Sequence, residues 1–147
     1  MISHSVEELL TRYAKAFGDL DVQGQMDLMS DAFISAGPAG VIAHNKEEFR
    51  ALATKMVDVY RSMGQEYVKL VSFHESRITD EYEIVNVRWG AKFKKIPNQI
   101  IEFDVSYLVQ HTGGAYTIMA YITHQDEAAM ARDFGLQSPG AQQQTVQ

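Results

Sequence analysis

Polar residues alternate with apolar ones in three segments of the second half of the chain, and their types suit the recognition of an oxygenated small molecule. Asn86 and Arg88 lie in the first segment, Asp104 and Ser106 in the second, and Tyr121 in the third. Antiparallel pairing of these segments would place Asp104 and Ser106 beside Tyr121, with Arg88 one strand away. Such a convergence can bind a carbonyl or hydroxyl group. The alternative is a solvated ladder of ordinary cross-strand contacts.

The five histidines do not predict a metal site. No two of them are spaced four residues apart, and no His-Glu-x-x-His motif occurs. The chain has no cysteine, which excludes disulfides, thiolate nucleophiles and Cys-bound zinc. We expect neither a metal ion nor another cofactor.

Length and charge limit the class of protein. A chain of 147 residues with 46% apolar content predicts one compact domain over residues 1–136, followed by a flexible tail over 137–147. The net charge of -6 opposes binding to phosphate backbones or anionic lipid. No apolar stretch approaches the roughly 18 residues of a spanning helix, and the first residues lack the pattern of a secretion signal. We therefore expect a cytoplasmic protein without nucleic-acid or membrane partners.

Three helices are predicted in the first half of the chain. A Ser or Asn followed three residues later by Glu starts the first and the third, and glycine ends both. Asp21 can cap a shorter helix between them. With their apolar residues at helical spacing, the predicted helices cover residues 5–18, 21–29 and 45–64.

The apolar period changes to two after Gly64, which predicts an antiparallel meander. The expected strands cover residues 66–78, 82–95, 100–110 and 116–125, with turns at 79–81, 97–98 and 112–114. One short strand is expected at 32–36, and Asp126 is expected to cap a last short helix.

Three stretches carry a resemblance to a known superfamily. TRYAKAF at 11–17 continues into GDLDVQGQMDLMSDAF at 18–33, a GPAG turn follows at 37–40, and TGGAYTIMAYITH ends the meander at 112–124. In this order they resemble the nuclear transport factor 2-like superfamily over about residues 5–125. The resemblance implies an α+β cone, in which three N-terminal helices pack on a curved, mainly antiparallel sheet that encloses a pocket.

The ketosteroid isomerases of that superfamily suggest roles for two residues. Arg12-Tyr13 matches their Arg-Tyr pair, which makes Tyr13 a candidate hydrogen-bond donor. Their general base directly precedes the proline of the first-strand turn, where this chain has Gly37, and no acid occurs between Ala32 and Ala43. Their second acid falls nearest Ser106. Asp104, two residues earlier on the same face, is therefore the candidate acid or base.

The two faces of the meander leave two arrangements open. Patterning alone places the apolar face, which includes Trp89, Tyr107 and Ile118, against the helices. The resemblance favours the reverse: Asn86, Arg88, Ser106 and Tyr121 would line the pocket, and the apolar face would form a homodimer. We adopt the second arrangement because a large apolar face left in water promotes aggregation.

Two functions remain open. The first is an isomerase, cyclase or dehydratase of the SnoaL-like or isomerase-like kind, acting on a small hydrophobic, oxygenated substrate with Asp104 and Tyr13 as catalytic residues. The second is a dimeric ligand-binding or assembly module without chemistry, which the missing acid at Gly37 favours. A superfamily this diverse does not decide between them.

Overall fold

A computed structural model describes residues 3–125 of the chain. Its helices and strands, in chain order, are α1 (Val6–Gly18), α2 (Val22–Met26), β1 (Met29–Gly37), β2 (Gly40–Asn45), α3 (Lys46–Ser62), β3 (Gln65–Arg77), β4 (Tyr82–Phe93), β5 (Ile96–Thr112) and β6 (Ala115–Thr123). The expected helix after Asp126 and the boundary at residue 136 lie outside the described residues.

The three helices begin where their capping residues predict. Ser5 accepts a hydrogen bond from the Glu8 amide at the start of α1, and Asn45 forms a complete capping box with Glu48 at the start of α3. Asp21 caps α2, but this helix ends at Met26. The prediction that it reaches residue 29 was wrong, because Met29 already belongs to β1.

The strands form one six-stranded sheet in the order β2-β1-β6-β5-β4-β3, antiparallel except where β1 meets β6. All four strands of the predicted meander are present. The turn expected at 97–98 is instead at residues 94–95, and Pro97 and Asn98 lie within β5. Strand β2 was not predicted; it forms a hairpin with β1.

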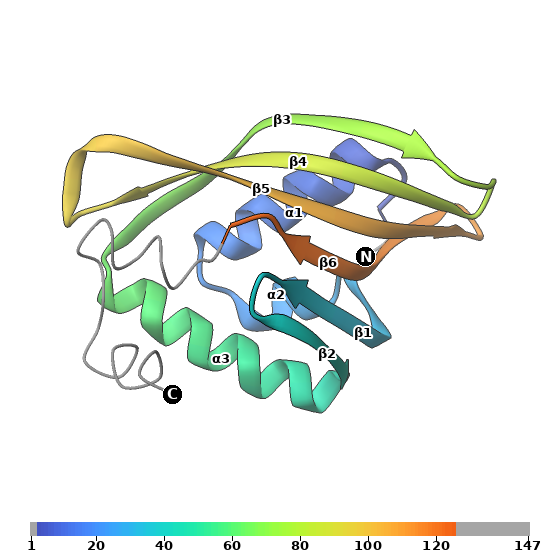
Figure 1. The fold of residues 1–147 in the computed structure, drawn as a ribbon, viewed down its shortest axis with the longest axis horizontal. Coiled ribbons are helices and arrows are strands. Elements are labelled where there is room, and N and C mark those ends of the chain that lie inside the picture. Colours follow the sequence, from blue (N-terminus) through green and yellow to red (C-terminus); the bar gives the residue numbers. More distant parts are fainter. Residues whose placement is uncertain (1–2, 126–147) are drawn as a thin grey trace.

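The apolar face of the meander packs against the helices of the same chain. Trp89, Tyr107 and Ile118 are each at most 2% exposed, in one core with Leu9 and Leu10 of α1. Figure 1 shows α1 beneath the long strands β3 and β4, and α3 beside the β1–β2 hairpin. The arrangement taken from the resemblance was therefore wrong, because these residues are already buried within one chain. Patterning alone had placed them correctly.

A bulge in β6 changes which residues share a face. Leu108 pairs with Ala120, but Val109 pairs with Ile118, so Met119 has no partner in β5. Beyond the bulge, Tyr121 lies opposite Tyr107 on the inner face, and Ile122 lies opposite Ser106 on the outer face. The prediction that Tyr121 stands with Asp104 and Ser106 was wrong for this reason.

None of the helices within residues 3–125 has both the length and the apolar character needed to cross a membrane.

Candidate functional site

Four of the six residues selected from the sequence meet on the outer face of the sheet. Asn86 pairs with Ser106, and Arg88 pairs with Asp104, across β4 and β5. The Arg88 guanidinium donates to both carboxylate oxygens of Asp104, at 2.9 and 3.1 Å. The Ser106 hydroxyl donates to Asn86 Oδ1 at 2.5 Å and lies 2.7 Å from His124 Nε2. The predicted proximity of these four residues is confirmed.

The ion pair determines the protonation of Asp104. Its hydrogen bond from Arg88 holds the pKa of the Asp104 carboxyl below the ordinary value, although partial burial opposes this effect. The same bond raises the pKa of the Arg88 guanidinium. Asp104 is thus a carboxylate at neutral pH and accepts both hydrogen bonds of a bidentate pair. It is a poor general acid in this state, and its basicity is reduced.

The remaining two selected residues, Tyr13 and Tyr121, lie on the inner face. Tyr13 is 4% exposed, and its ring centroid is 5.8 Å from that of Trp89 and 5.7 Å from that of Tyr107. The ring centroids of Tyr121 and Phe33 are 5.4 Å apart. The sheet therefore separates both tyrosines from Asp104, and one ligand atom cannot contact Tyr13 and Asp104 together.

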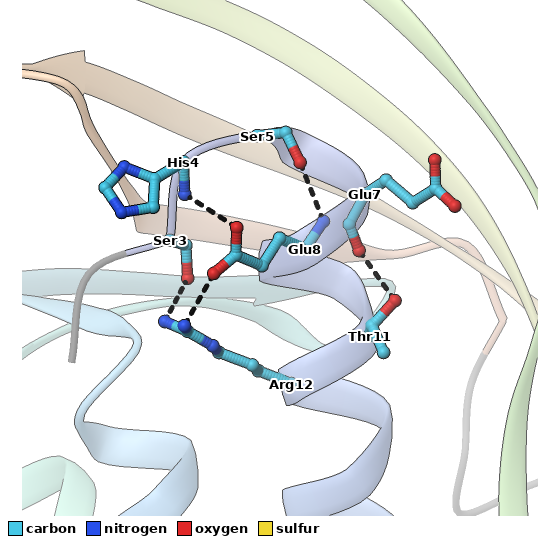
Figure 2. Close-up of polar contacts among 7 residues, drawn as sticks. All are labelled: Ser3, His4, Ser5, Glu7, Glu8, Thr11 and Arg12. Atoms are coloured by element: carbon cyan, nitrogen blue, oxygen red, sulfur yellow. Dashed lines mark hydrogen bonds and ion pairs between the residues drawn. The ribbon is translucent and has the colours of Figure 1, made fainter.

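The Arg12 side chain lies at the surface, whereas Tyr13 is buried. Figure 2 shows its guanidinium held by Glu8 and Ser3 near the start of α1, at 2.5 and 3.1 Å. Glu8 also accepts from the backbone amide of His4. Arg12 thus forms a surface ion pair that fixes the N-terminal turn, whereas the Tyr13 ring belongs to the core.

Two neighbouring hollows lie on the inner side of the sheet. The first is a small, partly enclosed cavity of about 30 Å³ between α1, α3 and β5, with aromatic walls that include Phe17, Tyr60 and Phe103. The second is an open groove of about 450 Å³ between the β1–β2 hairpin and α3. Met56, Tyr121 and Thr123 line both hollows and form the partition between them.

The groove was not found from the sequence, although one signal for it is present. Residues 32–43 carry no charge, and the hairpin that they form exposes 71% of Val41 and 58% of Ile42. Together with Leu52 and Met56 on α3, these side chains form apolar walls. Compared with the isomerases this stretch lacks an acid, and in the structure its apolar residues line the groove.

Close packing against Thr123 accounts for the glycine at position 37. A Cβ atom at Gly37 would lie 2.3 Å from Thr123 Oγ1, which is too close for any side chain unless Thr123 rotates. The same hydroxyl lies 3.4 Å from the Ala36 carbonyl oxygen, a long hydrogen bond. An aspartate at position 37 would therefore collide with Thr123 in its present rotamer.

Charged side chains are absent from the described lining of both hollows. Among residues 3–125, no Asp, Glu, Lys, Arg or His lines the cavity or the groove. His44 is outside the described lining, but its Nε2 lies 2.8 Å from the hydroxyl of Ser35, which lines the groove, and its ring contacts the Phe49 ring. In the same part of the chain, no group of three or more His, Cys, Asp or Glu could hold a metal ion.

Comparison with solved structures identifies the fold. A cystatin-like protein of unknown function from Nostoc punctiforme matches with a TM-score of 0.68 at 16% identity, over 82% of this chain and 88% of that chain. A nuclear transport factor 2-like protein of unknown function from Shewanella oneidensis matches with a TM-score of 0.66 at 15% identity, over 82% and 96%. The chain has the nuclear transport factor 2-like fold.

Another structure with this fold is a ketosteroid isomerase-like protein from Erwinia carotovora atroseptica. It matches with a TM-score of 0.57 at 12% identity, over 81% of this chain and 92% of that chain. No protein-family model and no curated protein matches the sequence. At these identities the likeness extends to the nuclear transport factor 2-like fold alone, so function has to be argued from the site.

Proposed function

We propose that this protein is a binding domain for a small, uncharged, largely apolar molecule, and that it performs no acid–base chemistry on it. The observation that carries the proposal is the absence of Asp, Glu, Lys, Arg and His from the lining of the cavity and the groove within residues 3–125. Apolar walls with a few hydroxyl groups are typical of sites for neutral ligands.

Proton transfer to or from carbon needs a group that titrates near the working pH and lies within hydrogen-bond reach. The described linings offer hydroxyls of tyrosine, threonine and serine and amides of glutamine, but no carboxylate, amine or imidazole. Asp104 lies across the sheet and is engaged by Arg88. These facts support the non-catalytic alternative over the isomerase-like one.

Binding can be tested with Nile red, an uncharged dye whose emission rises and shifts to the blue in apolar surroundings. We expect saturable binding by the unmutated protein. Ile42→Asp places a charge on the groove wall and should weaken binding at least about tenfold. Ile78→Asp is the matched control, because Ile78 is 57% exposed, nearly the same as Ile42, but lies outside the groove. Equal loss in both variants, or no saturable binding, would contradict the proposal.

The enzymatic alternative keeps Asp104 and Tyr13 as its catalytic residues and predicts turnover of a β,γ-unsaturated ketosteroid. We expect no turnover by the unmutated protein. Isomerisation that disappears in Asp104→Asn would show that Asp104 serves as the base and would overturn the non-catalytic proposal.

We also propose a homodimer through the outer face of the sheet. This face surrounds the Arg88–Asp104 pair and exposes large apolar side chains that include Ile84, Ile100 and Ile122. Ile100→Glu should yield monomer in sedimentation experiments, while Ile78→Glu should leave the dimer intact. A stable monomer of the unmutated protein at micromolar concentration would refute the dimer.

A further inference from the structure

The sizes of the two hollows decide where a ligand can lie. A water molecule needs a cavity of about 10–15 Å³, so the small cavity of about 30 Å³ has room for about two waters. The groove of about 450 Å³ falls within the range of small-molecule sites. Of the two hollows on the inner side, only the groove therefore has room for a ligand of more than a few atoms, unless the aromatic walls of the cavity move.

The groove has an apolar part and a polar end. Val41 and Ile42 on the hairpin line the groove together with Leu52 and Met56 on α3, which suits a hydrocarbon chain. At the partition to the cavity, the wall includes Tyr121 and Thr123, the hydroxyl-bearing side chains that line both hollows. A chain lying in the groove can thus place one oxygen-bearing end at the partition.

Thr123 is the better placed of the two hydroxyls to bind that end. Its Oγ1 lies at the Gly37 backbone, where a side chain at position 37 would displace it. Its hydrogen bond to the Ala36 carbonyl oxygen is 3.4 Å long, so a ligand oxygen at normal distance could replace it at small cost. Gly37 thus keeps the threonine hydroxyl at the floor of the groove.

We infer that the groove binds an uncharged molecule with an apolar chain and one oxygen-bearing end, an alcohol or ester rather than a carboxylate, with that oxygen at Thr123 Oγ1. This inference rests on the proposed binding function and names its site and ligand class. A carboxylate at the same place would lose water without meeting a cation, because the described lining has none.

The test uses decanol, methyl decanoate and decanoate as competitors of Nile red on the full chain at pH 7.5. Decanoate is ionised at this pH, whereas methyl decanoate has the same chain without the charge. We expect decanol and methyl decanoate to displace the dye at concentrations at least about tenfold lower than decanoate. Equal or better displacement by decanoate, or no displacement by any of the three, would overturn the inference. In either case saturable Nile red binding would leave the proposed function standing.

Substitutions of Thr123 test the place of the oxygen. Thr123→Val keeps the shape but removes the hydroxyl, and should weaken decanol about two- to tenfold, while Thr123→Ser should keep the unmutated affinity. Thr117→Val, the same change in the same strand outside the groove lining, is the control. Unchanged decanol affinity in Thr123→Val, with Nile red still displaced, would refute the contact at Thr123.

Discussion

Gly37 and Thr123 should be energetically coupled, because a side chain at one position needs the space of the other. In Gly37→Ala the new Cβ would lie 2.3 Å from Thr123 Oγ1 but 3.7 Å from Thr123 Cβ, an ordinary contact. Only the hydroxyl obstructs the change. Rotating it away, into a rotamer that the site does not favour, costs about 0.5–1.5 kcal/mol.

The backbone at Gly37 itself accepts alanine, since its φ is outside the left-handed region. Replacing Gly by Ala at such a position stabilises a protein by about 0.4–1 kcal/mol, because the unfolded chain loses freedom. In the unmutated background the two effects nearly cancel or leave a net loss. In a Thr123→Ala background only the gain remains, so we expect a coupling free energy of about 1 kcal/mol.

Urea denaturation of the unmutated protein, both single variants and the double variant gives this coupling as a double-mutant cycle. Thr123→Ala alone provides the control for the lost hydroxyl. If Gly37→Ala changes the free energy of unfolding equally in both backgrounds, within about 0.3 kcal/mol, the close packing at Thr123 does not explain the glycine.

Three further predictions concern stability. Glu83 is 5% exposed with Oε1 unpaired, and its pKa is raised by burial and by Glu75, against the opposing effect of Arg77 and His111. Because the pKa of Glu83 is higher in the folded than in the unfolded protein, the folded protein is more stable when Glu83 is protonated. This stability is fully present below about pH 4.3, the unfolded pKa, and is lost as the pH rises through the folded pKa. Glu83→Gln should therefore be more stable than the unmutated protein by about 1 kcal/mol at pH 7 and by little at pH 4. Equal differences at both pH values in urea denaturation would contradict this. Tyr107→Phe removes the acceptor that lies 2.8 Å from the buried Trp89 Nε1 and should cost about 1–3 kcal/mol in the same assay, and an unchanged urea midpoint would show that this hydrogen bond does not matter. Asn45→Ala removes the α3 capping box and should lower the free energy of unfolding by about 1 kcal/mol, whereas Asn45→Ser should lower it by much less. Equal effects of the two substitutions would mean that the cap is dispensable.

The elements that the sequence predicted correctly are those with a strong local signal. The capping residues of α1 and α3 stand directly before amphipathic stretches, and the four strands after Gly64 alternate apolar and polar residues. Strand β2 lacks such a signal, because five of its six residues are exposed and the strand therefore shows no buried face. Its hairpin forms one wall of the groove, so the groove was not predicted either, although the uncharged stretch at 32–43 is a signal for it.

The site residues were harder to predict than the helices and strands, because one extra residue at a bulge moves all following side chains of a strand to the opposite face of the sheet. The bulge at Met119 moves Tyr121 to the inner face, and nothing in the local sequence marks it. By contrast, the pairing of Arg88 with Asp104 and of Asn86 with Ser106 followed from regular antiparallel register. The proximity of these four residues was thus predictable, and so was their separation from Tyr13 by the patterning of the two faces, whereas their separation from Tyr121 was not.

The most direct test of the account is methyl-resolved NMR of the full chain during titration with decanol. If a neutral molecule binds between the β1–β2 hairpin and α3, the methyl signals of Val41, Ile42, Leu52 and Met56 should shift in a saturable way. The methyls of Ile84 and Ile100 on the outer face should stay in place. Saturable shifts confined to the outer face, or no saturable shifts at all, would contradict the claim that the uncharged groove is the binding site.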